Sequence, residues 1–99
     1  MALKDNIARG TLLVFLRTMF PQGVDRQTIC GIFVERIHPD LSIDSLEYMV
    51  SKGYIDRREI PHPYKKLEKI VTFRINSEGI DLCDGTTSDP GITIMPEED

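Results

Sequence analysis

Apolar residues recur at three- and four-residue steps over the first twenty positions of the chain. They are Ile7, Ala8, Leu12, Phe15, Leu16 and Met19. This spacing places them on one face of a helix, so the pattern predicts a helix over residues 3–20 that ends before Pro21. Leu13 and Val14 widen the apolar stripe, which indicates a helix that is buried on more than one side.

Two more helical segments follow, and each has a start and a stop signal. Asp25 is a typical N-cap for the second segment, which we expect to end by Pro39 because proline disfavours helix at the residue before it. The third segment begins with Asp40 or Ser42 as its cap and ends at Gly53, where a C-terminal glycine is typical. Its narrow apolar stripe consists of Ile43, Leu46, Met49 and Val50.

The hydrophobic period changes after the third helix. Residues 54–60 and 67–75 contain many β-forming residues and flank a proline-rich turn at residues 61–63. Two such segments around a turn predict a β-hairpin. Asn76 then caps a last short helix over residues 77–83.

The composition is that of an ordinary soluble domain. The chain has 99 residues, of which 40% are hydrophobic and 28% are charged. No apolar run reaches the roughly 20 residues that a membrane span needs, and the first residues lack the apolar stretch of a signal peptide. We therefore expect a cytoplasmic protein without a membrane partner. Cys30 and Cys83 lie far apart, and no disulfide is expected in that compartment.

The net charge of −4 hides an uneven distribution. Residues 1–53 are balanced, residues 54–75 carry six cations and three anions, and residues 76–99 carry seven anions and no cation. The predicted hairpin is therefore basic, and the C-terminal quarter supplies the negative charge. A basic hairpin is compatible with a nucleic-acid partner even though the whole chain is acidic.

The order of three helices, a hairpin and a short helix resembles the winged helix-turn-helix family. Residues 36–40 link the second and third helices with helix-turn-helix spacing. Residues 46–55 look like a recognition helix that runs through a Lys-Gly corner into a wing strand, and residues 73–80 like the second wing strand and a closing helix. The resemblance implies an α+β winged-helix domain over residues 1–85, with a three-helix core, a β-hairpin wing and a short C-terminal helix. We expect residues 86–99 to form a flexible acidic tail.

The C-terminal region also resembles small winged-helix proteins of Mu-like phages and prophages. The shared steps are Gly79-Ile80-Asp81, Gly85 and Pro90-Gly91-Ile92. The tail that follows these steps in that group is usually basic, whereas here residues 95–99 are acidic. The resemblance implies a phage or prophage context.

A winged helix implies a transcriptional regulator or accessory factor that binds double-stranded DNA. Its third helix enters the major groove, and its wing lies along the backbone or the minor groove. The third-helix contacts implied here are Ser42, Ser45, Tyr48 and Lys52. The wing contacts implied are Arg57, Arg58, His62, Tyr64, Lys65 and Lys66, with Lys69 as a further candidate.

The expected outward face of the third helix is poorly suited to reading bases. It has no Arg, Asn or Gln for bidentate base contacts, and Asp44 and Glu47 would repel phosphates. The wing cations fit phosphates better. The alternative hypothesis is therefore a winged-helix module that binds another protein and not DNA.

Other chemistry finds little support in the sequence. The two Cys and two His residues are not spaced as metal ligands, and no nucleophile–base pattern or phosphate-binding loop is present. We therefore expect that the chain is not an enzyme and binds neither a cofactor nor a metal. The apolar face around Leu12, Leu13, Val14 and Leu16 predicts a homodimer through the first helix. The apolar island at residues 92–95 could pair with a partner's sheet, the tail could cover the basic wing, or the tail could be a frayed end.

Overall fold

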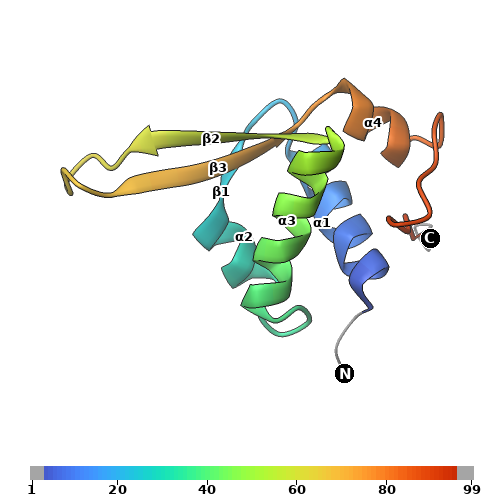
Figure 1. Ribbon diagram of the computed structural model, residues 1–99, viewed down its shortest axis with the longest axis horizontal. Coiled ribbons are helices and arrows are strands. Elements are labelled where there is room, and N and C mark those ends of the chain that lie inside the picture. Colours follow the sequence, from blue (N-terminus) through green and yellow to red (C-terminus); the bar gives the residue numbers. More distant parts are fainter. Residues whose placement is uncertain (1–3, 96–99) are drawn as a thin grey trace.

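The computed structural model describes residues 4–95, which form four helices and a three-stranded antiparallel sheet. The elements in chain order are α1 (Asp5–Met19), β1 (Val24–Asp25), α2 (Arg26–Ile32), α3 (Pro39–Lys52), β2 (Ile55–Pro61), β3 (Lys69–Ile75) and α4 (Ser77–Cys83). The hairpin of β2 and β3, residues 55–75, is called the wing. It projects well beyond the helices (Figure 1). The α+β order predicted from the sequence is confirmed.

Helix α1 is the centre of the core. Leu12, Leu13 and Leu16 are fully buried, and α1 packs against α3, α4 and β3. Burial of each such side chain stabilises the fold by about 1.5–3 kcal/mol. These leucines, three of the four residues that were expected to join two copies, are therefore used inside a single chain.

Helices α2 and α3 begin at side-chain caps. The Thr28 N–H donates to the Asp25 carboxylate at 3.0 Å, as predicted. The cap of α3 is His38, whose Nδ1 accepts from the Asp40 N–H at 3.1 Å, so the prediction of Asp40 or Ser42 as the cap is wrong. The cause is Pro39, which fits the first helical position because its missing N–H would be unpaired there anyway.

The ends of these two helices differ in how well they were predicted. Helix α2 ends at Ile32, earlier than expected, and turns lead from there to α3. Helix α3 ends at Gly53 as predicted, with a φ of 85°, in the left-handed region that glycine adopts without strain.

The sheet has the order β1-β3-β2, and its register fixes which side chains face the helices. Arg57 is opposite Phe73, which is fully buried, so Arg57 lies on the side of the helices. Arg58 is opposite Thr72, and Asp56 is opposite Arg74. Because side chains alternate between faces, Arg58 and Arg74 both lie on the outer face of the sheet.

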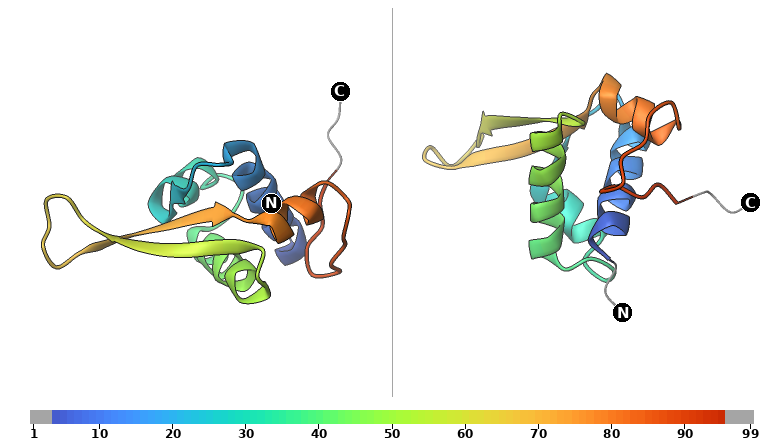
Figure 2. Two further views of the ribbon diagram at one scale, coloured as in Figure 1. Left: turned by 90° about the horizontal axis from the view of Figure 1, so that it is seen from above. Right: turned by 45° about the vertical axis from the view of Figure 1, so that its right-hand side comes forward.

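The chain returns to α1 after α4. Residues 89–94, called the strap, cross α1 (Figure 2, right). The Thr93 N–H donates to the Asn6 carbonyl at 3.0 Å, and Ile92 is only 4% exposed. The strap therefore belongs to the packed body, which differs from the flexible tail expected from residue 86 onward. Residues 96–99, which include Glu97, Glu98 and Asp99, lie outside the described residues.

Asp89 anchors the strap to the end of α3. Its carboxylate, 8% exposed, accepts from the Tyr54 hydroxyl at 2.6 Å and the Gly91 N–H at 2.8 Å, and it lies 3.6 Å from Lys52 Nζ. The Tyr54 hydrogen bond, followed by that from Gly91, lowers the pKa of Asp89 below its ordinary 3.8. The same contact raises the pKa of Tyr54 to about 12.

We expect this anchor to make stability depend on pH at the acid end. The pKa of Asp89 is lowered in the folded chain, so its contribution is complete above the unfolded pKa near 3.8 and is lost as the pH falls through the folded pKa. Asp89→Asn should therefore reduce the unfolding free energy at pH 7 and flatten its decline in acid. Urea unfolding at several pH values, with exposed Asp44→Asn as control, measures this. An acid profile unchanged by Asp89→Asn would contradict it.

Candidate nucleic-acid interface

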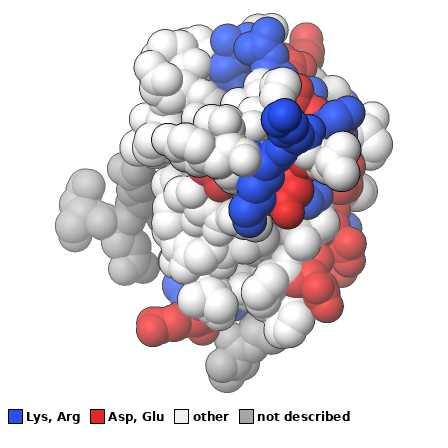
Figure 3. All heavy atoms as spheres, turned by 90° about the vertical axis from the view of Figure 1, so that its left-hand side faces the viewer, with Lys and Arg blue, Asp and Glu red and all other residues white. Residues whose placement is uncertain are grey.

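The exposed face of α3 is acidic. Asp40, Asp44, Glu47 and Ser51 follow one another at steps of four, three and four residues, and all are exposed. Figure 3 looks onto the tip of the wing, with basic side chains at the top and centre, some of them next to acidic ones, and a group of acidic side chains at the right, the side of α3. Carboxylates on this face oppose an approach to phosphates.

Ser42 and Ser45 do not lie on that face. They are 0% and 1% exposed, so the prediction that they contact DNA is wrong. The buried stripe of α3 runs through Ser42, Ser45, Leu46 and Met49, which shows that the helix is turned relative to the apolar stripe read from the sequence. Among the described residues, neither serine hydroxyl has a hydrogen-bond partner.

We predict that Ser45→Ala leaves the fold as stable as before or stabilises it by up to about 1 kcal/mol. Alanine removes an unpaired buried hydroxyl and is the better helix former. Thermal and urea unfolding measure the change, and exposed Ser51→Ala serves as control. Clear destabilisation by Ser45→Ala would mean that its hydroxyl has a partner in solution.

Tyr48 and Lys52 interact with the strap or with its neighbour α1, although Lys52 stays exposed. The Arg9 guanidinium lies 3.7 Å from the centre of the half-buried Tyr48 ring and donates to the Gly91 carbonyl at 3.1 Å. Lys52 pairs with Asp89. Both residues, expected to contact DNA, therefore connect α3 with α1 and the strap.

Two of the predicted wing cations are held in ion pairs. Arg57 lies 3.1 Å from Glu47 of α3 and 3.2 Å from Glu59, and Lys65 lies 3.6 Å from Glu68. Exposed pairs of this kind contribute about 0–1 kcal/mol. They nevertheless reduce the positive charge that these two side chains offer to a phosphate.

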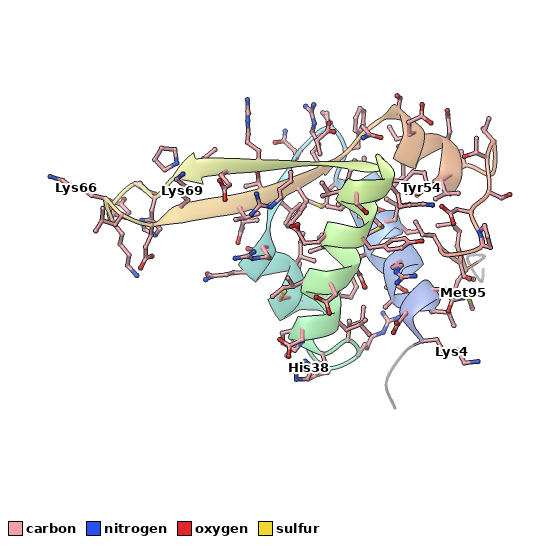
Figure 4. All side chains as sticks on the ribbon, in the orientation of Figure 1. Lys4, His38, Tyr54, Lys66, Lys69 and Met95 are labelled. Carbon is pink, nitrogen blue, oxygen red and sulfur yellow. The ribbon has the colours of Figure 1, made fainter. Side chains whose placement is uncertain are left out.

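Four other wing cations form no ion pair with any described residue. They are Arg58, Lys66, Lys69 and Arg74, all exposed. Arg58 and Arg74 line a groove of about 480 Å³ on the outer face of the sheet, together with Thr72 and Gly23. Lys66 and Lys69 lie in the outer part of the wing (Figure 4).

Arg74 was not among the contacts implied by the sequence. Alternation along β3, where Val71, Phe73 and Ile75 are buried, assigns Arg74 to the outer face. The hairpin register then brings it diagonally beside Arg58. The alternation along β3 and the register of the hairpin would therefore have identified Arg74, once β2 and β3 were aligned with each other.

The described residues offer few other sites. They contain no group of three His, Cys, Asp or Glu side chains that could hold a metal ion. No helix among them is long and apolar enough to cross a membrane. Within this part of the chain, the wing is the strongest candidate for a functional surface.

Comparison with known proteins supports the fold. No protein-family model matches the chain, and no curated protein matches it by sequence. A solved structure of a MepR mutant, from a multidrug-resistant S. aureus clinical isolate, is similar with a TM-score of 0.60 and 21% identity. The match covers 83% of this chain and 55% of that one, so this chain spans about half the length of its structural neighbour. MepR is a winged-helix regulator of the MarR family, and the chain described here has a winged-helix fold.

Proposed function

We propose that the chain is a cytoplasmic, non-enzymatic DNA-binding protein that contacts duplex DNA mainly through its wing. The observation that carries this proposal is a set of four exposed wing cations, Arg58, Lys66, Lys69 and Arg74, which form no ion pair with any residue that the structure describes. Arg58 and Arg74 lie on one face of the hairpin, and Lys69 lies on the other. Cations on both faces of the hairpin can contact the phosphates on the two sides of a DNA groove.

The acidic face of α3 sets the kind of binding that we propose. Helix α3 carries Asp40, Asp44 and Glu47 where a base-reading helix has donors. Binding is therefore weakly dependent on sequence and strongly dependent on salt. With three or four phosphate contacts, the logarithm of the affinity falls with the logarithm of salt concentration with a slope of about −3 to −4.

The fold shared with MepR supports a regulator or accessory factor of transcription. Within that class we propose a phage or prophage setting. It rests on the resemblance of residues 79–92 to small proteins of Mu-like phages.

Fluorescence anisotropy of a labelled duplex at low and moderate salt tests the proposal. We expect micromolar binding at low salt that weakens steeply as salt is added. Absence of binding at low salt, with a folded sample, would refute it.

A second candidate function is binding of a basic protein through α3, and the acidic face of that helix favours it. Under this alternative, the duplex titration gives no signal. A basic peptide instead perturbs α3, and Asp40→Asn/Asp44→Asn abolishes the effect. The two functions therefore predict opposite responses to duplex and to peptide.

A further inference from the structure

The tip of the wing, residues 61–68, presents two large apolar side chains to solvent. Leu67 is 99% exposed and Tyr64 is 89% exposed. The other exposed large apolar residues among those described reach at most 56%. Such exposure at the end of a projecting hairpin costs hydration free energy that burial against a partner would recover.

The tip is built as a fixed turn. The imidazole Nδ1 of His62 accepts hydrogen bonds from the N–H groups of Tyr64 and Lys65, both at 3.1 Å. The His62 N–H donates to the Glu68 carbonyl at 3.0 Å, and the Glu68 N–H donates to the Lys65 carbonyl at 3.1 Å. His62, expected to contact DNA, is thus engaged in shaping the turn that presents Leu67.

Cations surround the apolar tip. Lys66 is next to Leu67 in the chain, and Lys69 follows at the start of β3. Glu68, the carboxylate between them, pairs with Lys65 at 3.6 Å. An apolar side chain between two cations is complementary to a groove of duplex DNA, because base edges form the floor of the groove and phosphates line its two sides.

We propose that Leu67 is an apolar wedge that enters the minor groove of duplex DNA, partly separates two base pairs and bends the duplex. Lys66 and Lys69 contact phosphates beside the insertion, and Tyr64 packs on the exposed sugar and base edges. Single apolar side chains act in this way in minor-groove proteins that kink DNA. The proposal rests on the proposed function and assigns the chain an architectural role.

A lipid surface is the competing partner for an apolar and basic tip. Two apolar side chains bury too little area for firm membrane attachment, since even one acyl chain binds marginally. One side chain is enough, by contrast, to wedge between two base pairs. The observations therefore favour DNA.

Energy transfer between dyes at the two ends of a short duplex tests the proposal with the full chain. We expect the wild type to bend the duplex by about 20° or more, and Leu67→Ser to bind about tenfold more weakly with little bending. The salt slope of Leu67→Ser should match that of the wild type because its cations are unchanged. Because Leu67 is 99% exposed, its replacement does not disturb the core. Val34→Ser, at a residue 54% exposed and away from the wing, is the control and should bend the duplex fully.

The outcomes separate the wedge from the underlying function. Binding without bending, or equal bending by Leu67→Ser, overturns the wedge but leaves the proposed function intact. Absence of duplex binding overturns both. Binding to vesicles of anionic and neutral phospholipid that Leu67→Ser abolishes, with a straight duplex, would assign the tip to lipid and also overturn the wedge.

Discussion

Replacing Arg58 and Lys66 by alanine is expected to weaken duplex binding about 100-fold at roughly 50 mM salt, and to reduce the magnitude of the salt slope by about 2. Both side chains are exposed and form no ion pair with described residues, so their charge is available to phosphates. Each lost phosphate contact removes the counterion release that drives binding. Anisotropy titrations over a series of salt concentrations measure both quantities.

The matched control is the double variant Lys4→Ala/Arg36→Ala. It changes the net charge by the same amount at two exposed positions outside the wing. We expect its affinity to stay within about threefold of the wild type. Equal losses in both double variants would show that net charge, and not the wing, determines binding.

Replacing Gly10 by alanine is expected to release the strap and to lower the unfolding free energy by about 2–3 kcal/mol. A Cβ at Gly10 would collide with the backbone carbonyl of Thr93, which cannot move without displacing the strap. This loss of unfolding free energy has two sources. Ile92 becomes exposed to water, and the hydrogen bond from the Thr93 N–H to the Asn6 carbonyl is broken. Urea unfolding gives the free energy, and hydrogen exchange of the Thr93 amide reports release of the strap directly.

Gly31→Ala is the control for this substitution. Gly31 also lies within a helix, but nothing lies within 4 Å of the place where its Cβ would be. Alanine should stabilise α2 there by up to about 1 kcal/mol. If Gly10→Ala stabilises the chain similarly and the Thr93 amide stays protected, the strap does not pack on α1 in solution.

Local signals were enough to predict most of the fold. The Asp25 and Asn76 caps and the end of the third helix at Gly53 were all predicted from single residues and are confirmed. The wing was predicted from its change of period. The strand β1 was missed because two residues carry no periodicity, and it forms only by pairing with Phe73 and Thr72 of β3.

The hydrophobic pattern of α3 did not predict how this helix is rotated about its own axis. Ile43 and Val50 look like core residues in the sequence but are only partly buried, whereas Ser42 and Ser45 are fully buried. Serine is polar, so a pattern of apolar positions does not count it toward the buried face. The contacts of α3 with α1 decide the rotation of the helix, and these depend on tertiary packing.

The strap was missed for a different reason. Its partners Asn6 and Arg9 lie more than 80 residues earlier in the chain. Acidic and polar residues dominate the end of the sequence and suggested a solvated tail. Burial of Ile92, the Asp89 carboxylate and the hydrogen bonds of Gly91 and Thr93 nevertheless hold the strap on the body. The same packing accounts for Tyr48 and Lys52, whose contacts cannot be inferred from α3 alone.

We expect the wing, and not α3, to contact duplex DNA. Backbone amide chemical-shift mapping during titration with a short duplex tests this most directly, because it reports on all elements of the folded chain at once, at every residue except proline. The largest shifts should fall within residues 57–70, with small shifts at Asp40 and Asp44. Large shifts along the exposed face of α3 with an unchanged wing would contradict it.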